Sequence, residues 1–207
     1  MIDTDKLIEQ WKRGDESAAR LLYEQYYLQI FRLACGLLDS IEDAEEVMQD
    51  TLTYALTQIH RYDRQRAQFT TWLHTITVSR ARDKHRRNRW WQPANLLGLD
   101  RLTKMADESP SPVIWAEQAT QREDILQAVQ MLKPIQREVL MLRYWGEHTI
   151  EEIAQIVDCP VGTVKSRLRL AHKKLEPMLA ASLSDSGADR LSTCLPGNVA
   201  DNIFEGV

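Results

Sequence analysis

The sequence is short of the residues that build metal and redox sites. Its three cysteines are far apart and form neither a C-x-x-C pair nor a zinc-ligand pattern with histidine: Cys35, Cys159 and Cys194. This spacing gives no zinc site and fits a reducing compartment. The five histidines are scattered as well, and we expect each to lie on the surface or in a loop. We therefore predict no metal, no cofactor and no catalytic residue, which disfavours an enzyme such as a recombinase.

Long apolar runs are also missing. No stretch approaches the roughly 18 uninterrupted apolar residues that a membrane-spanning helix needs. The opening segment MIDTDKLIEQ is acidic and lacks the apolar core of a secretion signal. We therefore expect a soluble, cytoplasmic protein that is neither inserted into a membrane nor exported.

Strand signals are absent, because apolar residues recur with helical spacing almost everywhere and never alternate in twos between glycine-rich turns. The predicted fold is all-α, with two small helical domains joined by a flexible, proline-containing linker, since 207 residues exceed one small domain. The tail is polar and aperiodic, which is typical of disorder. The predicted boundaries are 1–92 for the first domain, 93–112 for the linker, 113–180 for a four-helix domain with a helix-turn-helix, and 181–207 for the tail.

Apolar periodicity and capping residues locate the individual helices. In the first domain we expect a short helix that ends at Gly14, a longer one with apolar residues from Leu21 to Leu38, a third capped by Asp39 and Ser40, and a fourth from Phe69. In the second domain we expect helices at 113–131, 134–144, 149–157 and 161 to about 178.

Charge is segregated along the chain, although the formal net charge is only -4. Residues 1–60 contain five basic and twelve acidic side chains, whereas residues 61–91 contain nine basic and two acidic ones. Residues 162–175 contain five basic side chains and no acidic one. The chain therefore has two basic segments that could contact nucleic acid within an otherwise acidic protein.

The second basic segment lies within the pattern TIEEIAQIVDCPVGTVKSRLRLAHKKL, a short helix, a tight turn and a cationic helix. This is the arrangement of a helix-turn-helix, whose second helix enters the major groove of DNA. The side chains that we expect on its outer face can reach phosphates and base edges: Thr163, Lys165, Ser166, Arg167, Arg169 and, one turn on, Lys173. The alternative is a charged hairpin that is merely solvated, which such a run of cations without acids disfavours.

The third and fourth helices of the first domain also carry charged faces. The third should bury one apolar face and leave an acidic one to solvent or to a partner: Glu45, Glu46, Gln49, Asp50 and Thr53. The fourth ends in arginines beside Trp90 and Trp91, which could combine phosphate contacts with stacking on unpaired bases. Plain solvation and core packing remain the alternatives for both helices.

Four segments in this order resemble the extracytoplasmic-function (ECF) sigma factors: DAEEVMQDTLTYAL, FTTWLHTITVSRARDKHRR, LKPIQREVLMLRYW and IEEIAQIVDCPVGTVKSRL. The resemblance spans roughly residues 14–178. It implies a sigma factor whose first domain binds the clamp of core RNA polymerase and melts promoter DNA, and whose second domain reads the upstream promoter element. It also implies an anti-sigma factor as a partner.

The resemblance assigns roles to individual residues. Glu46, Gln49 and Asp50 match the polymerase-docking helix. The segment 63–68 matches the loop that captures a flipped base, and Asp83 matches a position that touches the same element. The predicted contacts to melted DNA are Asp63, Arg64, Gln65, Asp83, Arg86 and Arg87.

In the recognition helix, Lys165, Ser166 and Arg169 match the family pattern. Leu170 stands where many members carry a cation, which predicts fewer or differently distributed upstream contacts. The alternative function is an autonomous helix-turn-helix regulator, which would bind a palindromic site as a dimer without polymerase.

Overall fold

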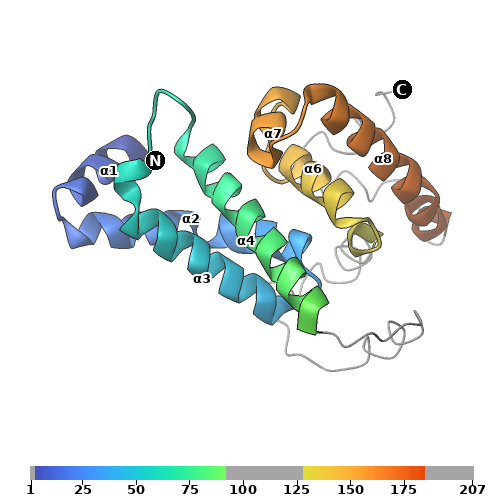
Figure 1. The fold of residues 1–207 in the computed structure, drawn as a ribbon, viewed down its shortest axis with the longest axis horizontal. Coiled ribbons are helices and arrows are strands. Elements are labelled where there is room, and N and C mark those ends of the chain that lie inside the picture. The colour runs from blue at the N-terminus through green and yellow to red at the C-terminus, as the bar shows by residue number, and fades with distance from the viewer. Residues whose placement is uncertain (1–2, 92–127, 185–207) are drawn as a thin grey trace.

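The computed structural model describes residues 3–91 and 128–184, and within these ranges the chain is helical without strands, as predicted. Figure 1 shows two groups of helices, with α4 lying between α3 and the second group. The predicted linker at 93–112 and most of the predicted helix at 113–131 lie outside the described residues. No described helix is both long and apolar enough to cross a membrane.

Four α-helices and a short 3-10 turn build the first domain: α1 (Thr4–Lys12), α2 (Glu16–Leu37), α3 (Ile41–Thr57), η1 (Ile59–Arg61) and α4 (Phe69–Trp91). Gly14 has a φ of 91°, a conformation that favours glycine, and it separates α1 from α2. The side chain of Ser40 accepts a hydrogen bond from the backbone N–H of Asp43 and so caps α3, as predicted.

Three further helices build the second domain: α6 (Pro134–Tyr144), α7 (Ile150–Val157) and α8 (Val161–Ser184). Thr149 and Glu152 form a reciprocal capping box at the start of α7. Helix α8 continues past Pro177 to Ser184, four residues beyond the predicted end of the second domain at residue 180. Residues 185–207 lie outside the described part.

The two domains pack directly against each other, α2 against α6 and α4 against α7. Gly36 of α2 lies so close to Met141 of α6 that a β-carbon there would overlap the methionine side chain. Seven consecutive residues of α6, 136–142, are buried. Because seven residues make about two turns, they cannot all face one side. The middle of α6 is therefore covered on every side by its own domain and by the first domain.

Candidate nucleic-acid interface

The helix-turn-helix is held by local backbone signals and a small apolar core. Asp158 ends α7 in the left-handed conformation, with a φ of 53°, and the chain turns into α8. Ile153 and Ile156 of α7 and Val164 and Leu168 of α8 are buried. This core fixes which side of α8 faces outward.

The structure places the predicted recognition residues on that outward side. Lys165, Ser166, Arg169 and Lys173 are exposed, and Thr163 and Arg167 are half-buried. The Ser166 hydroxyl donates to the Thr163 carbonyl at 2.9 Å, which leaves its oxygen free to accept. Within the part of the chain that the structure describes, none of the four cations of this set forms an ion pair. Their charges are therefore available to an anionic ligand.

The basic run of α4 is arranged differently, because most of its cations already have partners in the protein. The Arg80 guanidinium lies 5.2 Å from the centre of the Tyr54 ring, and Arg82 pairs with Glu138 of the second domain at 2.7 Å. Arg86 is more exposed than Arg82, Lys84 and Arg87 of this run, and among the described residues its ion pair is with Asp83, one turn away, at 3.0 Å. The side chains of Arg89, Trp90 and Trp91 lie outside the described part.

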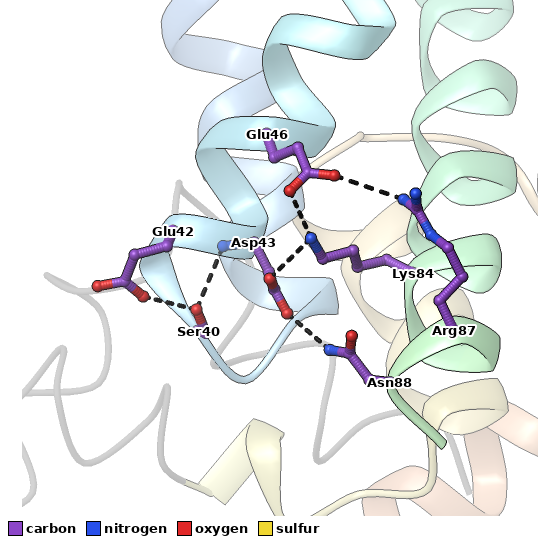
Figure 2. Close-up of polar contacts among 7 residues, drawn as sticks. All are labelled: Ser40, Glu42, Asp43, Glu46, Lys84, Arg87 and Asn88. Carbon is purple, nitrogen blue, oxygen red and sulfur yellow. Dashed lines mark hydrogen bonds and ion pairs between the residues drawn. The ribbon is translucent and has the colours of Figure 1, made fainter. Parts of the chain in front are cut away.

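Lys84 and Arg87 of α4 bind the acidic side of α3 (Figure 2). The Lys84 ammonium lies 3.0 Å from Asp43 and 2.5 Å from Glu46, and Arg87 lies 3.4 Å from Glu46. Asp43 and Glu46 are three residues apart, as are Lys84 and Arg87, so each pair lies on one helix face. Hydrogen bonding to Glu46 raises the pKa of Lys84 despite some desolvation. These four side chains, the α3–α4 ion network, connect the two helices.

This network changes the interpretation of the predicted polymerase-docking residues. Glu46 keeps 47% of its side chain exposed, yet its carboxylate is engaged by α4. Gln49 and Asp50 are exposed and have no side-chain partner among the described residues. Gln49 and Asp50 are therefore free to bind a partner, whereas Glu46 also supports the fold.

The loop 63–68 is exposed but anchored at both ends. Tyr62 and Phe69 are buried, and their rings meet edge to face at 5.1 Å between centroids. The Tyr62 hydroxyl donates to the Ala67 carbonyl at 3.2 Å. The Asp63 carboxylate accepts from the backbone N–H of Gln65 at 2.9 Å, a local turn that shapes the loop. Such a loop presents polar side chains without having to fold on binding.

Arg64, which was predicted to contact melted DNA, reaches back to Asp5 of α1 at 2.7 Å. Its side chain remains 72% exposed, so the pair is accessible and weak. An incoming phosphate could displace this carboxylate at little cost.

Sequence reasoning missed the charged and polar residues between the domains. Arg137 of α6 is buried and donates to the Leu37 carbonyl at 3.1 Å and to Asp39 at 2.7 Å. Glu138, its neighbour, accepts from Arg82. The signal was available in hindsight, since Gln136, Arg137 and Glu138 interrupt the face expected for a simple amphipathic helix. Their partners lie nearly 100 residues away or in another domain, which no local pattern specifies.

The prediction that each histidine lies on the surface or in a loop is wrong at His74, which is buried within α4. His148 lies in the loop before α7, as predicted, but it is buried as well. His74 and His148 are 1% and 4% exposed, because the packing of α4 against the second domain encloses both rings. Their ring nitrogens lie 2.7 Å apart. Among the described residues, no cluster of three or more His, Cys, Asp or Glu is arranged to hold a metal.

Comparison with protein families matches each domain separately. Residues 22–91 match the model described as Sigma-70 region 2, and residues 122–175 match the model described as Sigma-70, region 4. The first match includes the α3–α4 ion network and the 63–68 loop, and the second includes the helix-turn-helix.

Curated relatives match most of the chain. The chain is 28% identical over 179 residues to the ECF RNA polymerase sigma factor SigW of Bacillus subtilis, covering 84% of this chain and 95% of that protein. It is 29% identical over 184 residues to the RNA polymerase sigma-H factor of Pseudomonas aeruginosa, covering 84% and 94%.

Two solved structures share the fold. One is the sigma factor RpoE in complex with the anti-sigma factor NepR from Bartonella quintana, with a TM-score of 0.61 and 23% identity, covering 78% of this chain and 96% of that one. The other is CnrH in complex with the cytosolic domain of CnrY, with a TM-score of 0.60 and 22% identity, covering 86% and 99%.

Proposed function

Because the chain belongs to the extracytoplasmic-function sigma factors of bacterial RNA polymerase, we propose that its two domains divide the work of promoter recognition in the way their surfaces indicate. The second domain binds duplex DNA of the upstream element through α8. The first domain docks on core polymerase through the exposed part of α3 and holds the melted strand near the 63–68 loop. The chain itself acts as a non-catalytic specificity subunit in the cytoplasm, and the polymerase supplies the chemistry.

The observation that carries the duplex-binding role is the difference between the two basic helices. In α4, Arg82, Lys84 and Arg87 are neutralised by carboxylates of the protein. In α8, Lys165, Arg169 and Lys173 are exposed and unpaired among the described residues. Phosphate binding needs cations whose charge is not already compensated. The free chain is therefore better prepared to bind duplex with α8 than melted DNA with α4.

The polymerase-docking role rests on Gln49 and Asp50. They lie one turn beyond the α3–α4 ion network, and no described side chain of the protein satisfies them. The network holds α3 rigidly against α4, which preorganises this short polar patch for a partner.

An anti-sigma factor is a further proposed partner, because one of the solved structures that share this fold, the sigma factor RpoE, is in complex with the anti-sigma factor NepR. The rival function, an autonomous helix-turn-helix regulator, is not favoured, because residues 22–91 match Sigma-70 region 2.

The test is reconstitution with purified core polymerase. We expect the full chain to co-elute with the core enzyme and to support runoff transcription from its own promoters. A chain that fails to bind core polymerase, yet binds duplex tightly as a dimer, would contradict the proposal and favour the rival.

A further inference from the structure

The contact between His74 and His148 joins the two domains. His74 lies in α4, and His148 precedes α7. Nδ1 of His74 is 2.7 Å from Nε2 of His148, and the rings meet at 89° with 4.9 Å between centroids. Both side chains are almost fully buried. A hydrogen bond of this geometry requires one nitrogen to donate and the other to accept, so the facing nitrogens share one hydrogen.

The surroundings of the pair favour its neutral form. Burial, together with the neighbouring His148, lowers the pKa of His74 to about 3. Burial also lowers the pKa of His148, against the opposing effect of Glu152. Nε2 of His74 is buried without a hydrogen-bond partner among the described atoms. A proton added to His74 would therefore place an uncompensated charge in the domain interface.

The charged groups near the pair would stabilise an added proton on one ring more than on the other. On the α7 side, the Glu152 carboxylate lies 3.6 Å from Nδ1 of His148, but it is also bound by the Thr149 backbone N–H at 2.8 Å. On the α6 side, the Arg143 guanidinium donates to the His148 carbonyl at 3.0 Å and adds positive charge. On α4, no described acid forms an ion pair with His74. Glu152 can stabilise one charge on His148, but nothing described stabilises one on His74.

The remaining polar contacts across the interface do not depend on histidine. Arg82 pairs with Glu138, and Arg137 pairs with Asp39. Arginine stays charged throughout the physiological range. The histidine pair is therefore the contact between the domains that mild acid changes first.

We propose that the His74–His148 contact is an acid-labile latch, which holds the two domains closed while both rings are neutral and releases them when the rings take up protons. The latch is a property of the free chain and stands whichever promoters the chain recognises. Release separates α4 from α7 and exposes Arg82 and the surface of α6.

The direction of the pH dependence follows from linkage. In the closed arrangement both pKa values are below the ordinary value of 6.5. In the separated arrangement both rings meet water and regain ordinary pKa values, so opening takes up protons. The latch is fully effective above the ordinary pKa and weakens as the pH falls below it. Each histidine that gains a proton on opening lowers the closed-to-open ratio by up to about tenfold per pH unit.

The experiment is single-molecule energy transfer between dyes on non-canonical residues at the exposed positions Thr53 and Glu176 of the full chain. The separation is followed from pH 8 to pH 5.5, with circular dichroism at each pH to show that the helices remain. Wild type, His74→Gln, His148→Gln and the double variant are compared. His60→Gln is the matched control, because His60 is exposed in the first domain.

For wild type and H60Q we expect the open fraction to rise as the pH falls below about 6.5, with helix content unchanged. Each single variant should show a shallower response, and the double variant should show none. A double variant that is open at every pH also supports the latch when wild type opens in acid. A wild-type separation that stays constant to pH 5.5, or a double variant with the full wild-type response, would overturn the proposal.

Discussion

Arg82 of α4 and Glu138 of α6 form a bidentate ion pair across the domain interface. Nε of Arg82 donates to Oε1 at 2.9 Å, and Nη2 donates to Oε2 at 2.7 Å. The same Nη2 also donates to the Val157 carbonyl at the end of α7 at 3.2 Å. Hydrogen bonding to Glu138 raises the pKa of Arg82 against partial desolvation. One arginine of the basic helix thus connects three helices and two domains.

Replacing Glu138 should loosen this junction. Glu138→Gln leaves the guanidinium without its counter-charge at a site where the glutamate side chain is only 7% exposed. We expect the free energy of unfolding to fall by about 1.5–3 kcal/mol, the usual value for a hydrogen bond to a charged group. Urea denaturation measures this loss. Glu24→Gln, which breaks an exposed pair with Arg20, is the control and should change stability by less than about 1 kcal/mol. Equal effects of the two substitutions would contradict the assignment.

Glu46 and Asp50 should respond differently to substitution, although both lie on the acidic side of α3. Glu46→Gln removes a partner of Lys84, whose side chain is 12% exposed, and we expect a loss of about 1 kcal/mol in stability. Asp50→Lys should leave the fold intact and abolish binding to core polymerase. Thermal melting and a pull-down on the same preparations separate the two effects. An Asp50→Lys protein that still binds the polymerase would remove the proposed docking patch.

Arg169 should contribute to promoter binding through its exposed guanidinium. If Arg169 contacts a base edge, Arg169→Ala should weaken binding to the preferred sequence by about 1–3 kcal/mol. If it contacts only phosphate, binding to all sequences should weaken equally, and the number of counterions released on binding, read from the salt dependence, should fall by about one. Fluorescence anisotropy across a salt series distinguishes the two. The control is Arg20→Ala, an exposed change on α2, which should alter neither the affinity nor its salt dependence. Unchanged DNA binding by Arg169→Ala would show that α8 does not contact DNA through Arg169.

Leu170 offers the converse experiment. Its side chain is 48% exposed beside Arg169, in a position where a cation would meet the same ligand. Leu170→Arg should strengthen duplex binding and steepen its salt dependence by about one ion. The same anisotropy assay measures both quantities. A weaker complex would show that Leu170 makes an apolar contact, with a thymine methyl group for example.

Local sequence signals predicted the helices of this fold better than the contacts between the helices. Ser40 caps α3 as predicted, and Thr149 caps α7 through the same kind of local contact, because each cap depends on neighbours within three residues. The outward side of α8 follows in the same way from the burial of Val164 and Leu168. These features require only helical periodicity.

The partners across helices could not be predicted from the same information. Lys84 belongs to the basic run of α4 in the sequence, but its ammonium binds Asp43 and Glu46 of α3. Pairing of this kind depends on the register between two packed helices. His74 and His148 are 74 residues apart, and their burial exists only because the two domains close on each other.

The enclosure of α6 also has a consequence for the separated form of the protein. Charged groups such as Arg137 and Glu138 can exchange their present partners for water, but Met141, which fills the space beside Gly36, cannot. Separating the domains therefore exposes an apolar surface of α6 around Met141. The open chain should be prone to self-association unless another protein covers this surface. Light scattering at rising concentration, under conditions that open the chain, would record this loss of solubility.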